Sequence, residues 1–416
     1  MVTPPSGVSP GNMAIPRSAQ ADEPISTGEM AALGTHLLIP TTLMFLPTAV
    51  IRIAFQDGWL SNILGFGLTL MLAAILLPLL AHAAPGQGLL EALRWRAPWI
   101  ARWLGLVFGF ALVHLEALVV IEIGILWQQA VMPETPDTFF AITALVLAAL
   151  SARAGIEPLG RTALLFAGIL LIFTPVILFM SFDLIHPAEF QPVLANGMKP
   201  VVVATQPVLG FGEELLLLAL GLGYLRPRPG SSPAKASFQV VALATGISMG
   251  VTVLFFAATI AALGPREASR DLLPTLTYMH LIRLGEFIQR IEGVVLLFWT
   301  WSILTKAGLV HLLACQAWGA VFAIRDARVL SLPLVGLVFA ESRILIRDTI
   351  ELVHYLMIWG LIATMFFLVP LLIGLVAIGL TPSPNRPAPP PNAAVPGQNT
   401  LSPNGPSPAP GGQPVP

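Results

Sequence analysis

The sequence predicts an all-α polytopic membrane protein with ten transmembrane helices. Three observations support this fold class: the composition, the number of long apolar segments, and two segments that are interrupted at matching places. The chain has 416 residues, of which 56% are hydrophobic and only 10% are charged, and its mean hydropathy is +0.82. Soluble domains carry about 25% charged residues, so the deficit indicates a chain that crosses a bilayer many times.

Ten segments are long and apolar enough to cross the hydrocarbon core, which takes about 20 residues of α-helix. The fourth and ninth are short, and the eighth is long enough to extend beyond the bilayer. Residues 265–285 contain Pro274 and an amphipathic run, which predicts a short helix at one membrane surface. In chain order the ten predicted spans are 26–53, 60–82, 99–130, 138–153, 158–182, 199–224, 237–262, 287–320, 329–345 and 352–379.

Basic residues predict the orientation of these spans, because Lys and Arg are enriched in cytoplasmic loops. Every even-numbered loop is basic, whereas the third loop holds Glu134 and Asp137 and neither Lys nor Arg. Both chain termini are therefore expected in the cytoplasm. The basic loop residues are Arg94, Arg96, Arg102, Arg153, Arg161, Arg226, Arg228, Lys235, Arg325 and Arg328.

The two ends of the chain differ in composition from residues 25–380, which we expect to form the transmembrane domain. Residues 1–24 are polar and contain Pro without an apolar core, so we expect a disordered cytoplasmic segment and no cleavable signal peptide. Residues 381–416 are dominated by Pro, Asn, Gly, Ser and Ala. Such a segment cannot bury a core, and we expect a disordered cytoplasmic tail.

Helix-breaking residues interrupt the first and the sixth predicted spans. Pro40 and Pro47 enclose one interruption, and Pro207 precedes Gly210 and Gly212 in the other. Proline removes a backbone donor and glycine tolerates unwinding, so each helix is expected to open. In a bilayer, unpaired backbone groups persist only where they line a cavity or bind something. Matching interruptions in two halves of a chain indicate a transporter-type binding site near the midplane.

The two interruptions define the candidate ligand site. The ends of broken helices present N–H groups with a positive dipole, or carbonyl groups with a negative one, and these complement the two charges of an amino acid zwitterion. The alternative interpretation is that Pro40 and Pro207 only kink packed helices. The candidate pocket residues are Thr41, Thr42, Leu43, Val208, Leu209, Gly210, Phe211 and Gly212.

Three charged residues lie deep within apolar spans. Glu213 and Glu214 occupy the middle of the sixth span, where a carboxylate costs about 3 kcal/mol and is normally functional or paired. A neutral acid, a proton-coupling site and half of a structural ion pair are all open interpretations of Glu213. Lys306 lies about 24 Å along the eighth span from Arg290 at about 1.5 Å per residue. Its ammonium could reach the cytoplasmic interface by snorkelling.

Other polar residues give weaker indications. Glu116 and Glu122 in the third span could pair with other helices or line a cavity. Cys315 is expected to be a small buried hydrophobe. No Ser/His/Asp set, phosphate loop or metal-ligand cluster is present, so we expect no catalysis, no cofactor and no metal. The net charge of −1 gives no indication of a nucleic-acid partner.

Several local motifs occur in a consistent order along the chain. They are Ile25-Ser26, Gln56-Asp57-Gly58-Trp59, Met132-Pro133-Glu134-Thr135-Pro136, Ala152-Arg153-Ala154-Gly155-Ile156-Glu157 with Arg161, Asn196-Gly197, Phe211-Gly212-Glu213, and Glu286-Phe287 with Gln289-Arg290, Trp299 and Lys306. In this order they resemble the spore germination permease family, the membrane-embedded B subunits of germinant receptors. That family belongs to the amino acid–polyamine–organocation superfamily, and its members usually have Gly where this chain has Pro40.

The resemblance implies a LeuT-type fold with two inverted five-helix repeats, here 26–182 and 199–379, whose first and sixth helices are broken. It implies a subunit that senses a small germinant, with an amino acid as the expected ligand, in a complex with A and C subunits in the spore inner membrane. It also selects Glu213 as a site residue.

In LeuT-type folds the eighth span packs against the first near its break. Lys306 could therefore act as an internal cation there, meeting unpaired carbonyls in place of a sodium ion, and this interpretation competes with snorkelling. For the whole chain, the main alternative is an amino acid transporter that works by alternating access, with or without proton coupling. A structural anchor for partner subunits is a third interpretation, which leaves the broken helices without a purpose.

Overall fold

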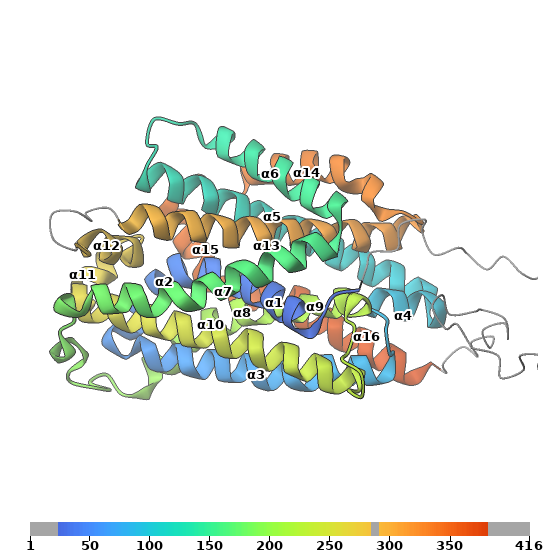
Figure 1. Ribbon diagram of the computed structural model, residues 1–416, viewed down its shortest axis with the longest axis horizontal. Coiled ribbons are helices and arrows are strands. Elements are labelled where there is room, and N and C mark those ends of the chain that lie inside the picture. Colours follow the sequence, from blue (N-terminus) through green and yellow to red (C-terminus); the bar gives the residue numbers. More distant parts are fainter. Residues whose placement is uncertain (1–23, 284–290, 382–416) are drawn as a thin grey trace, which may run out of the picture. The chain divides into compact units, whose positions relative to one another are not determined.

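The computed structural model describes residues 24–283 and 291–381. The predicted disordered segments and the Glu286 to Arg290 motif lie outside these residues, apart from Pro24 and Thr381. Within them the chain is helical, and a single bridge pairs Ile25 with Leu225. The long helices run along a common direction, with the short helices α11 (Pro265–Arg270) and α12 (Pro274–Leu281) at one end of the bundle and α4 (Leu89–Arg96) at the other (Figure 1).

The helix bounds follow the predicted spans closely in most of the chain. The long helices are α3 (Gly58–Ala83), α5 (Pro98–Ala130), α6 (Asp137–Ala154), α7 (Ile156–Met180), α10 (Pro233–Leu263), α13 (Ile291–Phe322) and α14 (Ser331–Ile344). The last predicted span comprises α15 (Thr349–Ala363), a π-helical turn η7 (Thr364–Leu368) and α16 (Val369–Leu380). Among the described residues, eight helical segments are long and apolar enough to cross a bilayer. The count of ten therefore stays a prediction.

The first predicted span divides into α1 (Thr27–Met44) and α2 (Leu46–Ala54). The helix begins with a capping box: Glu29 N–H donates to the Ser26 hydroxyl, and Ser26 N–H donates to the Glu29 carboxylate. Pro40 lies inside α1 without ending it. The interruption comes at Phe45, and Pro47 is in the first turn of α2, where the missing N–H of proline costs nothing.

The sixth predicted span also changes its geometry. It begins with α8 (Met198–Glu213), which contains Pro207, and continues as a 3₁₀ segment η4 (Glu214–Leu217), a short α9 (Leu218–Gly221) and another 3₁₀ turn η5 (Leu222–Tyr224). Stretches of 3₁₀ inside a helix mark sequences under strain or hinges. The change from α-helix to 3₁₀ starts at Glu214, two residues after Gly212.

Helices α5 and α13 form an antiparallel pair across the bundle (Figure 1). Trp127 on α5 donates an indole N–H to the Thr300 hydroxyl on α13 at 3.0 Å. About five turns further along, Gly109 lies against the ring of Trp318, where an added Cβ would lie 2.9 Å from the indole nitrogen. Between these two contacts, the facing sides of α5 and α13 carry four buried titratable residues. They are Glu116, Glu122, Lys306 and His311.

Helix α1 is enclosed by other helices. It packs against α10, α7 and α13, and every residue from Met30 to Val50 is buried. His36 joins three of these helices, because one ring nitrogen lies 2.7 Å from the Ser302 hydroxyl on α13 and the other 3.0 Å from the Ala163 carbonyl on α7. The first interruption therefore lies in the core, where polar groups need partners from the protein.

Candidate ligand site

Lys306 lies at the centre of a buried polar cluster between the two interrupted helices. Its ammonium is 2.8 Å from a carboxylate oxygen of Glu214 and donates to the Thr41 hydroxyl at 3.0 Å. The Lys306 side chain is 1% exposed and that of Glu214 is 0% exposed. The side chain therefore points into the bundle and does not take the snorkelling arrangement. Its described partners are a carboxylate and a hydroxyl, whereas the sequence suggested backbone carbonyls.

Thr41 connects this ion pair to the third predicted span. Its hydroxyl donates to Glu122 Oε2 at 2.8 Å while it accepts from Lys306. The cluster thus holds two carboxylates and one ammonium, contributed by α1, α5, η4 and α13. With all three groups ionised it carries an excess negative charge, and uncompensated charge at bilayer depth is expensive. The arrangement therefore suits a further cationic group or a proton.

The backbone carbonyl of Pro40 accepts a hydrogen bond from a side chain on the face of α13 that carries Lys306. Trp299 Nε1–H donates to the Pro40 carbonyl at 2.8 Å, and Trp299 precedes Lys306 by seven residues, which places both on one helix face. On the opposite side of α1, the Thr42 hydroxyl donates to the Leu38 carbonyl at 2.8 Å and lies 3.1 Å from the Thr252 hydroxyl on α10. Side chains from two neighbouring helices therefore satisfy polar groups next to the first interruption.

Glu213 points away from this cluster, to the last predicted span. The Thr364 hydroxyl lies 3.0 and 2.9 Å from its two carboxylate oxygens and also 2.8 Å from the Gly360 carbonyl. Thr364 is the first residue of the π-helical turn η7, and such turns are frequent at functional sites. Glu213 is 2% exposed. At the end of α8, Glu213 therefore connects to Thr364 in η7, whereas Glu214 connects to Lys306 on α13.

Several predicted pocket residues on α8 pack against the neighbouring helices α3 and α15. A Cβ on Gly210 would overlap the backbone of Gly360 on α15, and one on Gly212 would overlap Thr69 on α3. Val208 packs against Gly65, and Phe211 is stacked on Trp359 with ring centroids 6.1 Å apart. Leu43 is buried next to Thr42, while Leu209 is half-buried. Of the predicted residues, the structure brings Thr41 and Lys306 into direct contact.

Glu122 and Glu214 complete the cluster, although their partners could not be assigned from the sequence. A second buried pair lies further along α5 and α13, where His311 Nδ1 is 2.8 Å from Glu116 Oε1 and both side chains are 0% exposed. The other ring nitrogen of His311 lies 3.0 Å from the Ser331 carbonyl. The antiparallel register of α5 and α13 brings His311 to Glu116 and places Lys306 near Glu122, which it meets through Thr41. The separation of six residues between Glu116 and Glu122 was the available signal.

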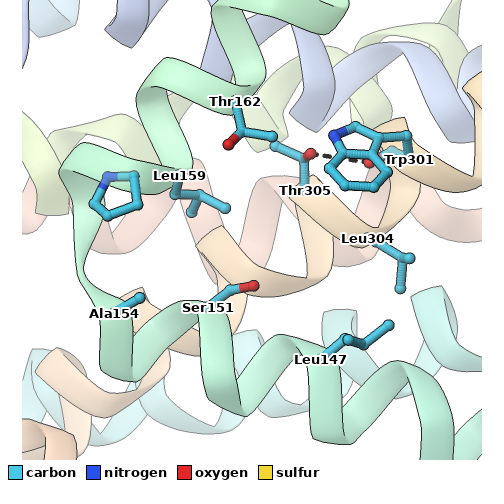
Figure 2. A pocket seen from close by; sticks show the side chains of 9 residues that line it. Leu147, Ser151, Ala154, Leu159, Thr162, Trp301, Leu304 and Thr305 are labelled. Carbon is cyan, nitrogen blue, oxygen red and sulfur yellow. Dashed lines mark hydrogen bonds between the residues drawn. The ribbon is translucent and has the colours of Figure 1, made fainter.

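Within the described residues, three of the cavities are lined by residues other than the predicted pocket residues. The first, of about 210 Å³, lies between α6, α7 and α13, and its wall includes Ser151, Thr162 and Thr305 (Figure 2). The second, of about 280 Å³, lies between α5, α14 and α15. The third, of about 350 Å³, lies between α4 and α13. Around Thr41 and Lys306 the side chains are closely packed, so the structure corresponds to a closed site.

The sequence matches the family model described as spore germination protein over residues 24–349. This match covers most of the chain and both interrupted helices. The chain belongs to the spore germination permease family. The family resemblance noted from the ordered motifs is thereby confirmed.

Relatives of this spore germination permease include two proteins of Bacillus subtilis (strain 168). Spore germination protein KB is 25% identical over 268 residues, which are 62% of this chain and 67% of that protein. Spore germination protein YndE is 22% identical over 282 residues, which are 66% of this chain and 75% of that protein.

Solved structures establish the fold of the permease. Mhp1, a nucleobase-cation-symport-1 family transporter in a closed conformation with bromovinylhydantoin bound, superposes with a TM-score of 0.62 at 10% identity, covering 84% of this chain and 79% of that chain. MhsT in complex with L-phenylalanine superposes with a TM-score of 0.56 at 12% identity, covering 85% and 88%. The permease is therefore a multi-pass membrane protein with a LeuT-type fold, and its relatives are permeases and transporters rather than enzymes.

Proposed function

We propose that this permease is the germinant-sensing membrane subunit of a spore germination receptor and that it binds a small amino acid between α1 and the α8–η4 junction. The observation that carries the proposal is the buried cluster of Glu122, Thr41, Lys306 and Glu214. It joins the two interrupted helices and has one carboxylate more than it has ammonium groups.

The charge count explains why an amino acid suits this site. Its α-ammonium group would compensate the excess carboxylate of the cluster, and its carboxylate could accept hydrogen bonds from N–H groups where the helices are interrupted. L-phenylalanine is the molecule bound to MhsT, which has the same fold. The candidate contacts are Thr41, Thr42, Leu43, Val208, Leu209, Gly210, Phe211, Gly212 and Glu213, although Gly210 and Gly212 also form helix contacts.

Membership of the family supports a proposal for the partner subunits, the membrane and the orientation of this chain. We propose that A and C subunits of a germinant receptor assemble with this chain, that the complex lies in the spore inner membrane, and that both termini face the spore core. We further propose that 26–182 and 199–379 are the two inverted repeats. Co-purification of the chain with an A-type and a C-type subunit from spore membranes tests the assembly.

Substitutions at Lys306 test the role of the cluster. If the ammonium is a fixed internal cation, germination should be independent of sodium. Lys306→Met should silence the receptor, and Lys306→Arg should substitute poorly because a planar guanidinium cannot replace a compact charge. Lys235→Met, at an exposed position at the start of α10, is the matched control. Near-normal germination and abundance of both Lys306 variants would contradict the proposal.

An amino acid transporter that works by alternating access is the second candidate. Two observations favour it: the structural relatives include transporters, and Glu213 is buried against a hydroxyl group, an arrangement that suits a protonated carboxyl. Uptake of labelled amino acids into proteoliposomes by the chain alone would support this function. Binding without uptake would support the receptor. Absence of both would favour a structural anchor for the partner subunits.

A further inference from the structure

A second polar cluster lies away from Lys306, in the cavity of about 280 Å³ between α5, α14 and α15. His114 Nδ1 lies 2.6 Å from Glu341 Oε1, and the Tyr355 hydroxyl contacts His114 Nε2. A neutral imidazole satisfies both contacts, because Nδ1–H donates to the carboxylate and Nε2 accepts from the hydroxyl. The negative charge of Glu341 is then not compensated by a full positive charge within the cluster.

Glu341 also keeps room for a ligand. Its hydrogen bond to His114 uses Oε1. Within the described residues no hydrogen bond to Oε2 is present, and the side chain is 26% exposed. None of the nine residues that line the cavity is Lys or Arg. The cavity therefore offers a free carboxylate oxygen and no group that would attract an anion.

The rest of the wall is apolar and mostly aromatic. Phe110, Tyr355, Trp359, Phe366 and Phe367 surround the polar cluster. Trp359 forms the inner side and lies parallel to His114, with ring centroids 6.3 Å apart. Aromatic faces attract organic cations by cation–π interactions. Aromatic walls with a single carboxylate are a chemistry that recognises ammonium groups attached to an apolar body.

The cavity lies at mid-length of α5 (Pro98–Ala130), because His114 is the central residue of that helix. At about 1.5 Å per residue, His114 is about 24 Å from either helix end. Phe110 and Phe366 at the rim are 52% and 42% exposed. A compact molecule that enters through the rim is the occupant that fits.

We propose that this cavity is a second small-molecule site that binds a compact amine with an apolar body and no carboxylate. The ammonium would pair with Glu341, and the apolar body would lie against the aromatic wall. An amino acid is disfavoured, because its carboxylate would lie near Glu341 with neither Lys nor Arg among the lining residues to pair with it. Trp359 on its wall is also stacked on Phe211, so the cavity adjoins the proposed amino acid site, but its lining residues and its ligand class differ.

The test is isothermal titration of 2-phenylethylamine onto the purified full chain. Two matched compounds accompany it: 2-phenylethanol replaces the amine with a neutral group, and L-phenylalanine adds a carboxylate. We expect saturable binding of the amine, and affinities at least tenfold lower for the other two compounds at this site. Equal affinities of the amine and the alcohol, or displacement of the amine by L-phenylalanine, would overturn the proposal.

Two variants locate the binding. Glu341→Gln should weaken amine binding at least tenfold, whereas Glu267→Gln at the exposed surface of α11 should leave it unchanged. Should Glu341→Gln not fold, Ile362→Trp, which fills the cavity and leaves the carboxylate in place, decides the question by abolishing amine binding. Unchanged binding in either folded cavity variant would overturn the proposal. Thr41→Val, which should weaken amino acid binding at the Lys306 cluster, should retain amine binding, so failure of that site is distinguishable from failure of this one.

Discussion

The ammonium of Lys306 lies 2.8 Å from the carboxylate of Glu214, and both side chains are closed off from solvent. Taking two charges out of water is costly, and the attraction between them offsets that cost only while both are present. The pair joins α13 to the point where α8 becomes 3₁₀. The Lys306–Glu214 ion pair therefore determines both the stability of the closed state and the net charge of the site that a ligand contacts.

Replacing Lys306 by Met should destabilise the protein by about 3–5 kcal/mol, because Glu122 and Glu214 would remain buried without a cation. Thermal or denaturant unfolding of the purified protein measures the effect, with Lys235→Met as control. The double variant Lys306→Met with Glu214→Gln should recover part of the loss, since it removes one orphaned charge. Equal stability of wild type and Lys306→Met would show that the ion pair makes no net contribution.

Gly210→Ala should destabilise the bundle, because the added Cβ would overlap the backbone of Gly360. Gly250→Ala on α10 is the matched control, since nothing lies within 4 Å of its added Cβ. Alanine in a helix interior is normally favoured over glycine by about 1 kcal/mol. Opposite signs of the two changes in unfolding temperature are expected. Stabilisation by both substitutions would mean that α8 and α15 are less closely packed than described.

Trp299→Phe should cost about 1 kcal/mol, because the buried carbonyl of Pro40 loses its indole donor. The control is Trp301→Phe, whose side chain is 41% exposed and stacked on Phe166. Unfolding free energies of the two variants, measured in the same detergent, give the comparison. An equal cost at both positions would assign the loss to ring size and not to the hydrogen bond.

Glu213→Gln should leave the fold intact, because an amide oxygen can still accept from the Thr364 hydroxyl. If the chain is a proton-coupled transporter, this variant should lose the pH dependence of uptake while it still binds its amino acid. If the chain is a receptor in which Glu213 acts as a neutral acid, the amide replaces it well, and germinant binding should be within about twofold of wild type, a difference of about 0.4 kcal/mol. Loss of binding together with loss of stability would assign Glu213 a structural role.

The sequence was sufficient for the fold class and for the family, because spans of apolar residues and the order of motifs are local features. Pro40, Pro47 and Pro207 lie in the two predicted spans whose helical geometry changes. They did not indicate the positions, since Pro40 and Pro207 lie inside α1 and α8 and the geometry changes at Phe45 and Glu214. Neighbouring side chains such as Trp299 support the backbone around proline, and such support depends on tertiary contacts.

The composition of the site was less predictable. Lys306 could be singled out as the charged residue deep in an apolar span, but its partners Glu122 and Glu214 come from helices 184 and 92 residues away in the chain. Adjacent residues on a helix point about 100° apart, so the sequence showed that Glu213 and Glu214 have different neighbours without showing which. Glycine spacing could not distinguish a ligand pocket from the close crossing of α8 and α15.

Binding of amino acids to the purified chain tests the central proposal most directly. In isothermal titrations with a panel of amino acids, at least one should bind saturably to the wild type. Thr41→Val should reduce its affinity at least tenfold, because the variant lacks the hydroxyl between Glu122 and Lys306. Thr143→Val at an exposed position of α6 should bind as the wild type does. Amino acid binding that is unchanged in Thr41→Val, or no binding of any amino acid to the wild type, would contradict the proposed site.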